Sequence, residues 1–271
     1  MRTLITLSFI TTFLVITIFS APAALDPNLI LYFTFDEQLD GRVIEDMTGG
    51  GNNGKLRLGA TLTNEPEEVY KGAGALKISG NISQQFRVEP FDRMNRYQDH
   101  TVAFWIYFFE GFHQGEARSI FKKNADEAQV LNAGFSKSPS VQISGNSFTL
   151  WYEVGEEGGI NGLGPDGKGS EFELKRWYHI AGVKKGADLI IYIDGEEEGI
   201  FDVPKKFPQG EGRLRIGGTR TRAAYFAMDE FALFDRVLTE NEVELMEQGV
   251  FLSVEPQDKL TTTWGRLKTG R

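Results

Sequence analysis

Three aspartates lie beside turn-forming residues, where their carboxylates could bind a metal ion. Asp36 ends the first predicted strand, and Asp229 lies in the last one. Asp46 precedes the glycine-rich residues 49–53, whose turns expose backbone carbonyls. Calcium prefers several such oxygen ligands. If the first and last strands are neighbours, this set predicts a structural calcium site. The alternative is that Asp36 and Asp46 brace turns and that Asp229 pairs with an arginine.

Aromatic side chains at three positions could bind a sugar. Residues 148–154 alternate apolar and polar side chains, which places Trp151 on the solvent-facing side of a half-buried strand. Phe112 and His113 lie in a short predicted loop. An aromatic ring can stack on the C–H face of a pyranose while polar groups bind its hydroxyls. We therefore expect all three residues to contact a ligand. The alternative is that the glycine-rich loop 155–170 covers Trp151 and that Phe112 is an isolated surface ring.

Motifs for catalysis or for a nucleotide cofactor are incomplete. Residues 162–168 have the glycine and lysine spacing of a phosphate-binding loop, but Gly169 stands where serine or threonine must bind magnesium. Glu171 and Glu173 have the alternating spacing of paired glycosidase carboxylates on a short strand, but they lie beside a flexible loop. The sequence has no cysteine and no Gly-x-Ser-x-Gly motif. We therefore expect no catalytic residue and no cofactor other than calcium.

The elements that carry these residues are almost all strands. Short stretches of aromatic and β-branched residues recur between Gly, Asn and Asp, a spacing typical of a sandwich or barrel. One helix is predicted at residues 239–248. Thr239 caps this helix, Glu242 completes a capping box, and Gly249 ends it. The predicted fold is all-β, with two antiparallel sheets and one short C-terminal helix. Its strands are at residues 29–35, 56–62, 75–78, 101–108, 119–121, 148–154, 177–183, 189–193, 214–216 and 225–234.

The charge of the chain limits its partners. It has 29 Lys and Arg against 38 Asp and Glu, a net charge of -9. Nucleic-acid affinity depends on clustered positive charge, so we expect no nucleic-acid partner. One basic cluster occurs, and it suits an anionic glycan, although alternating positions on a solvent-facing strand explain its first two members equally well. The cluster consists of Arg213, Arg215, Arg220 and Arg222.

The N-terminal residues predict export. Arg2 gives a positive start, residues 4–19 are apolar, and the Ala-Pro-Ala at 21–23 provides small residues for a signal peptidase. Cleavage before Ala24 would leave a secreted, periplasmic or cell-surface protein without a stable membrane anchor. An uncleaved anchor is the alternative. The predicted organisation is a signal peptide at 1–23, one sandwich domain at 24–250 and a tail at 251–271.

Seven fragments of the sequence occur in the order expected for one family. They are LYFTFDE at 31–37, Asp46 with GGGNNG at 49–54, GAGAL at 72–76, TVAFW at 101–105, WYHIA at 177–181, YIDG at 192–195, and MDE at 228–230 with FDRVL at 234–238. Across residues 29–250 the chain thus resembles the LamG-like jelly-roll domains of the concanavalin A-like lectin/glucanase superfamily.

This resemblance implies two curved antiparallel sheets packed face to face, secretion, and carbohydrate or protein binding. It also implies calcium near the terminal strands, at Asp36 and Asp229, with Asp46 and a carbonyl of Gly72 or Gly74 as further ligands. Many relatives have a disulfide that this cysteine-free chain lacks. The hydrolases of the superfamily carry a Glu-x-Asp strand motif, which is missing here.

The combined expectation is a secreted, non-catalytic module that binds a polysaccharide, a cell-surface glycoconjugate or a surface protein. The first alternative is a polysaccharide hydrolase or lyase, which only the resemblance to the superfamily suggests. The second is a structural surface protein that assembles with copies of itself, in which the tail from Ser253 is a docking element.

Overall fold

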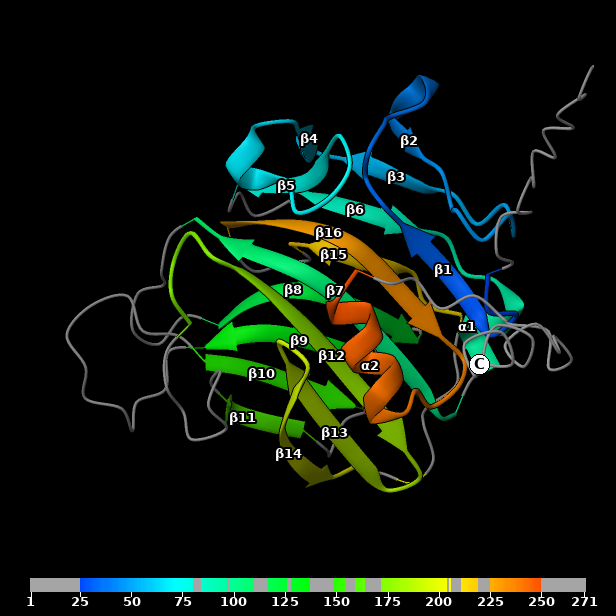
Figure 1. The fold of residues 1–271 in the computed structure, drawn as a ribbon. Coiled ribbons are helices and arrows are strands. Elements are labelled where there is room, and N and C mark those ends of the chain that lie inside the picture. The colour runs from blue at the N-terminus through cyan, green and yellow to red at the C-terminus, as the bar shows by residue number, and fades with distance from the viewer. Residues whose placement is uncertain are drawn as a thin grey trace, which may run out of the picture. The chain divides into compact units, whose positions relative to one another are not determined.

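The computed structural model describes residues 25–79, 84–96, 98–109, 117–125, 128–136, 149–154, 159–163, 172–203, 205, 211–218 and 225–249. They lie within one compact unit, Leu25–Leu252. They form two antiparallel sheets with a few short helices, which confirms the all-β sandwich (Figure 1). Within these ranges, no helix is both long and apolar enough to cross a membrane.

The front sheet, nearer the viewer in Figure 1, contains both the first and the last strand. Its order is β14-β13-β12-β7-β16-β5-β4, and β1 also pairs with β16. Tyr32 lies opposite Ala232 in that antiparallel pair, so the first and last strands are neighbours as predicted. The strands are β1 (Leu29–Phe33), β4 (Thr61–Thr63), β5 (Ala75–Ser79), β7 (His100–Phe108), β12 (Trp177–Lys185), β13 (Asp188–Ile193), β14 (Glu196–Asp202) and β16 (Tyr225–Phe234).

The back sheet lies behind it, with the order β11-β10-β9-β8-β15-β6-β3-β2. All its neighbouring strands are antiparallel. The strands are β2 (Val43–Ile44), β3 (Gly54–Arg57), β6 (Gln85–Val88), β8 (Ala117–Ala125), β9 (Ala128–Ser136), β10 (Thr149–Val154), β11 (Gly159–Leu163) and β15 (Leu214–Gly217).

The hydrophobic core lies between the two sheets. Phe86 of the back sheet packs edge-on against Phe33 and Phe35, with ring centroids 4.8 and 5.2 Å apart. Phe104 of the front sheet meets Phe121 of the back sheet in the same way at 5.6 Å. All five rings are fully buried, and burial of one such side chain contributes roughly 1.5–3 kcal/mol to folding. Aromatic packing thus joins the two sheets in the core.

Helix α2 (Glu240–Glu247) covers part of the outer face of the front sheet (Figure 1). Its start confirms the prediction: the Thr239 side chain accepts from the Glu242 N–H, and the Glu242 carboxylate accepts from the Thr239 N–H at 2.8 Å. Val243 and Met246 are buried and belong to a cluster on the sheet's outer face. The other short helices are α1 (Asp92–Arg96), η1 (Asp40–Arg42) and η2 (Pro66–Glu68).

The structure corrects two of the predicted elements. The predicted strand 56–62 is divided between β3 and β4, because Leu58 and Gly59 turn the chain with φ values of 52° and 95°. The predicted glycine-rich loop contains β11, which needs only backbone groups to pair with β10. Helix α1, which precedes β7, has only five residues, and α2 is the longer helix of the described structure.

Candidate functional site

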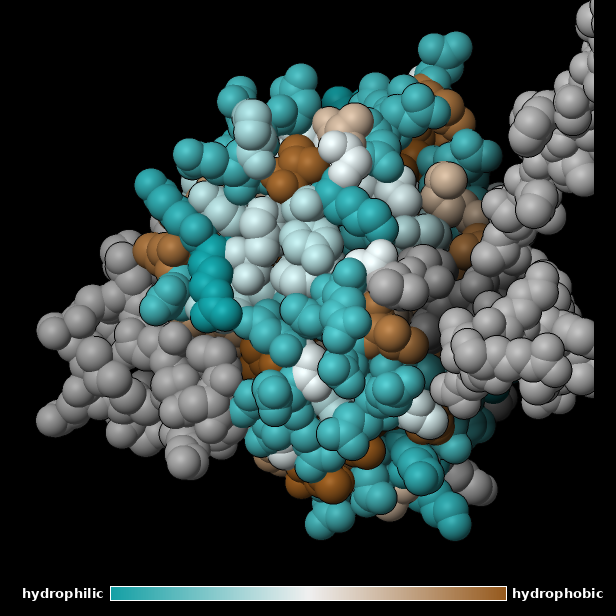
Figure 2. All heavy atoms as spheres, in the orientation of Figure 1, coloured by the Kyte–Doolittle hydropathy of each residue, from teal (hydrophilic) through white to brown (hydrophobic). Residues whose placement is uncertain are grey.

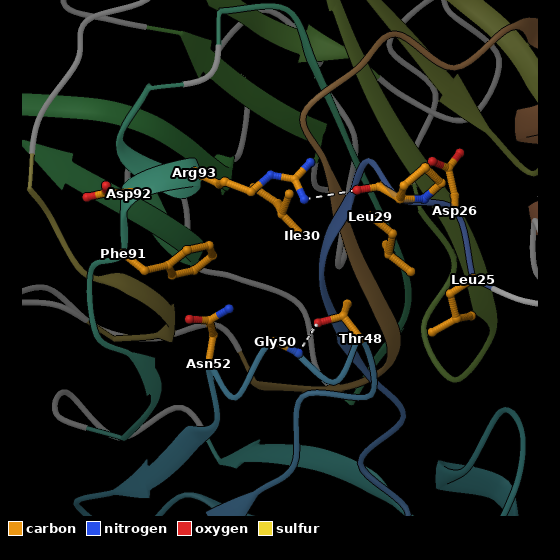
Figure 3. A pocket seen from close by; sticks show the side chains of 11 residues that line it. Leu25, Asp26, Leu29, Ile30, Thr48, Gly50, Asn52, Phe91, Asp92 and Arg93 are labelled. Atoms are coloured by element: carbon orange, nitrogen blue, oxygen red, sulfur yellow. Dashed lines mark hydrogen bonds between the residues drawn. The ribbon is translucent and has the colours of Figure 1, made fainter.

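A cavity of about 480 Å³ lies beside the start of β1, where the loop before β3 and the segment that enters α1 meet it (Figure 3). This volume falls within the usual range for small-ligand sites. The wall includes the apolar side chains of Leu29, Ile30 and Phe91 and the polar side chains of Thr48, Asn52 and Arg93.

The loop on one side of the cavity is held in shape by Asp46. This aspartate is 1% exposed, and its Oδ1 accepts hydrogen bonds from the backbone N–H groups of Tyr32 and Thr48. Its Oδ2 accepts from the Thr48 hydroxyl at 2.8 Å. That hydroxyl oxygen accepts from the Gly50 N–H, as Figure 3 shows. Asp46 therefore fixes the loop that presents Asn52 to the cavity.

The opposite side is formed by α1 and the residue before it. Met94 is buried and anchors the helix, while Phe91 stays partly exposed at the cavity. Arg93 donates from Nε and Nη2 to the Asp235 carboxylate, at 2.9 and 2.7 Å. Its Nη1 donates to the Pro27 carbonyl at 2.9 Å (Figure 3). Arg93 is thus held in place with its charge paired.

The groups around this cavity suit binding of a polyhydroxylated ligand. Phe91 offers an aromatic ring, and Asn52 and Thr48 offer an amide and a hydroxyl. Asp26 is buried and accepts from Arg236 Nε at 2.7 Å. Asp92, whose side chain is 86% exposed, points away from the other lining residues in Figure 3. The described lining therefore holds no facing carboxylate pair of the kind that glycosidases use.

The three aspartates of the predicted calcium site lie in two places. Asp36 accepts from the Ala73 N–H, and Asp229 Oδ2 accepts from the N–H groups of Tyr70 and Lys71. Both therefore hold the segment 70–73, which offers them amide donors, whereas Asp46 holds the cavity loop. The described residues contain no group of three or more acidic or histidine side chains that could bind a metal together. The contacts of these aspartates thus match bracing of turns, and calcium binding stays a prediction.

Asp229 is buried beside a second, partly buried carboxylate, Glu230. Burial raises the pKa of Asp229 to about 8, in spite of hydrogen bonds from three backbone N–H groups. The next residue, Glu230, has a φ of 51° at an irregularity in the pairing of β16 with β7. Its carboxylate accepts from the Tyr32 hydroxyl at 2.6 Å. Burial and the charge of Glu230 raise the pKa of that tyrosine.

Aromatic rings cover the part of the front sheet that α2 leaves open. Tyr70 stacks on Trp105 with centroids 3.6 Å apart and planes 13° apart. Trp177 lies 5.9 Å from Tyr70 and 5.5 Å from Tyr107. Figure 2 looks onto this face and shows pale, weakly polar residues at its centre. Trp105 and Tyr107 are 7% and 5% exposed, so the rings mainly pack against one another.

The predicted ligand-binding residues Trp151, Phe112 and His113 stay predictions. Trp151 lies in β10 of the back sheet, opposite Gly134 of β9, and its side chain is outside the described part. Phe112 and His113 lie outside the described residues. Glu171 also lies outside the described residues. Glu173 is exposed and lies outside any strand, so its predicted strand position is wrong.

Sequence reasoning missed Phe91 and Arg93 at the cavity. A weak signal for them exists, because Pro90 stands just before a short run of helix-compatible residues. Asn52 lies in the fragment GGGNNG at 49–54, whose glycines indicate turns. Nothing in that fragment marks Asn52 as a ligand-binding residue. None of these three lies near Trp151 in the sequence, and only the fold brings residues 48–52 and 91–93 together.

Solved structures with the same fold include binding domains and enzymes. Domain 4 of an extracellular arabinanase of Geobacillus stearothermophilus, determined with arabinotriose, has a TM-score of 0.58 and 16% identity over 82% of this chain and 98% of its own. The receptor-binding domain of botulinum neurotoxin type G has a TM-score of 0.55 and 14% identity, with 82% and 51% covered. A Trypanosoma rangeli sialidase has a TM-score of 0.55 and 13% identity over 83% of this chain and 33% of its own.

These identities support the shared fold alone, and the chain spans about half of the toxin domain and a third of the sialidase. No curated protein matches the sequence. The family profile described as the concanavalin A-like lectin/glucanases superfamily matches residues 79–244, more than half of the chain. The chain therefore belongs to the concanavalin A-like lectin/glucanase superfamily.

Proposed function

We propose that this protein is a secreted, non-catalytic module that binds a neutral glycan in the cavity beside β1. The observation that carries the proposal is the lining itself. A partly exposed Phe91 ring faces a rigid loop with Asn52 and Thr48, and the nearby acids are paired or point away. Such a site can stack on a sugar ring and bind its hydroxyls, but it lacks the acid and base that hydrolysis needs.

Preorganisation supports binding at this place. Because Asp46 and the Arg93–Asp235 pair fix the two walls, a ligand would order few side chains on entering. A site that is already ordered loses less conformational freedom on binding and therefore binds more tightly. The family contains carbohydrate-binding and glycan-active domains, which agrees with a glycan as ligand.

Calorimetric titration with neutral oligosaccharides tests the proposal. Arabinotriose is the first probe, because a domain of the same fold was solved with it, and xylo- and gluco-oligosaccharides extend the panel. Phe91→Ala should weaken binding roughly tenfold by removing the stacking surface. Asp46→Ala should weaken it by loosening the loop. Asp92→Asn is the matched control and should bind like the parent protein.

Two results would contradict this function. Absence of binding across the neutral panel would remove the cavity as a glycan site. Release of reducing sugar from a polysaccharide panel would show a hydrolase and favour the catalytic alternative. Export and structural calcium complete the proposal. Export is independent of the cavity, whereas Asp46 is both a predicted calcium ligand and the residue that fixes the cavity loop. Export is tested by the N-terminal sequence of the mature protein, which should begin at Ala24 if the signal peptide is cleaved as predicted.

A further inference from the structure

The outer face of the back sheet carries a row of positive charges that the sequence alone does not reveal. Leu56, Phe86 and Leu214 point into the core. Because side chains alternate along a strand, the residues next to them point outward. Strands β3, β6 and β15 thereby present Lys55, Arg57, Gln85, Arg87 and Arg215 on the outer face. No acidic residue occurs among these five outward positions.

Three of these cations are directly in register across neighbouring strands, together with Lys122 of β8, which is partly exposed between the buried Phe121 and Lys123. Lys55 of β3 pairs with Arg87 of β6, and Arg87 pairs with Arg215 of β15. Arg215 in turn pairs with Lys122 of β8. Neighbouring strands lie about 4.8 Å apart, so this cationic row spans roughly 14 Å across the sheet. The register continues to Asn132 of β9, which ends the run of cations.

Such a row works against the stability of the folded protein. Like charges directly opposite each other on neighbouring strands are destabilising. Glu89, just after β6, relieves part of the repulsion, because it pairs with Arg87 and Arg213 at 2.7 Å each. Burial and the charges of Arg213 and Arg87 lower the pKa of Arg215. Arg87 Nε is buried without a hydrogen-bond partner in the described structure.

The charge of the row is opposite to that of the chain. The protein carries a net charge of -9, so a concentration of cations on one sheet face does not follow from composition. The row is also narrow and regular, with one cation per strand. It fits a linear ligand that crosses the strands and carries a negative charge at intervals. A protein partner would instead need aromatic or aliphatic anchors, which the five outward positions lack.

We propose that the cationic row Lys55–Arg87–Arg215–Lys122 binds a linear anionic polysaccharide whose carboxylate or sulfate groups pair with successive strands. The choice of a polysaccharide rests on the proposed function; the site is separate from the cavity. A duplex nucleic acid carries a charge about every 1.7 Å, and a net-negative protein would repel it more strongly than a polysaccharide with one charge per sugar. Arginine is well suited to carboxylate and sulfate because its planar fork can donate two parallel hydrogen bonds.

Binding of labelled polygalacturonate and dextran sulfate across a salt series tests the row. The parent protein should bind at least one of them at low salt and should not bind neutral dextran. The double variant Arg87→Gln/Arg215→Gln should bind about tenfold more weakly or worse. Its affinity should also depend less steeply on salt, because fewer counterions are released when the ligand binds. Preference for one probe identifies carboxylate or sulfate as the recognised group.

A matched control removes the same charge elsewhere. Arg96→Gln/Lys185→Gln removes two exposed cations from α1 and from the end of β12, and it should bind the anionic probes like the parent. Urea unfolding should show that the row variant is at least as stable as the parent, so that lost binding is not lost folding. The row variant Arg87→Lys/Arg215→Lys keeps the charges but loses the planar forks, so it should bind more tightly than Arg87→Gln/Arg215→Gln and more weakly than the parent.

Three results would overturn the inference. They are failure of the parent protein to bind either anionic probe at low salt, equal loss in the row and control variants, and tighter binding of oligothymidylate than of both polysaccharides. The cavity is tested separately. Phe91→Ala should leave anionic binding intact, so a failed neutral-glycan titration with intact anionic binding removes the cavity proposal and keeps the row.

Discussion

His179 makes the stability of the protein depend on pH in a way that one substitution can isolate. Its ring is 1% exposed in β12, beside Trp105 with centroids 5.3 Å apart. Its Nδ1 has no hydrogen-bond partner in the described structure. Burial lowers the pKa of His179 from 6.5 to about 3. The folded protein therefore keeps this imidazole neutral well below the pH at which the unfolded chain protonates it.

The sign and size of the effect follow from proton linkage. Below pH 6.5 the unfolded chain gains a proton at His179 that the folded protein does not, so the free energy of unfolding decreases as pH falls. The slope approaches about 1.4 kcal/mol per pH unit, and the loss between pH 6.5 and pH 5 is about 1.5 kcal/mol. His100, whose pKa burial also lowers to about 3, acts in the same direction. Asp229, with a pKa raised to about 8, acts in the opposite direction.

Urea unfolding of the parent protein and of His179→Gln over this pH range tests the prediction. Since His100 and Asp229 are present in both proteins, the difference between them reports His179 alone. The parent should lose about 1.5 kcal/mol more than the variant between pH 6.5 and pH 5. At pH 8, where the histidine is neutral in both states, the difference should reflect packing and hydrogen bonding only. Parallel stability curves for the two proteins across the range would refute the reasoning.

Three further predictions concern calcium, a helix cap and a glycine. If calcium binds the folded protein, its melting temperature should rise with calcium concentration, and less so in Asp229→Asn; no rise in the parent would exclude the ion. Thr239→Ala should lower the free energy of unfolding by about 1 kcal/mol in urea, since it removes the side-chain cap of α2; an unchanged midpoint would contradict the capping contribution. Gly72 has a φ of 78°, and a Cβ there would lie 1.9 Å from a neighbouring aspartate oxygen. Gly72→Ala should therefore destabilise the fold more than Gly49→Ala, where φ is 74° but the space is open; equal effects would mean that the clash is relieved by movement.

Local sequence patterns were enough to predict the fold class and the C-terminal helix. Residues 101–108 and 225–234 were predicted almost to their ends, because long aromatic and β-branched runs need no tertiary help to identify. Thr239 and Glu242 were assigned correctly because a capping box acts over three residues. Short elements such as β6 and α1 were missed, since four or five residues carry little periodicity.

The candidate sites depend on contacts between distant segments. The cavity forms where the start of β1, the loop before β3 and the segment that enters α1 meet. The spacing of these segments in the sequence does not predict that they meet. The cationic row needs the register between strands whose residues, from Lys55 to Arg215, are far apart in the chain. Arg213, Arg215, Arg220 and Arg222 form a cluster in the sequence because they lie within ten residues. Strand pairing instead places Arg87 beside Arg215.

The position of β16 has a consequence for biosynthesis. This strand lies between β7 and β5 and also pairs with β1, so it links the two halves of the front sheet. Until residues 225–234 leave the ribosome, β1 has no partner in that sheet, and β5 is not joined to β7. A nascent chain that stops short of these residues should remain open to proteases. Nonsense alleles that end upstream are thus expected to yield degraded protein and not a shortened working module.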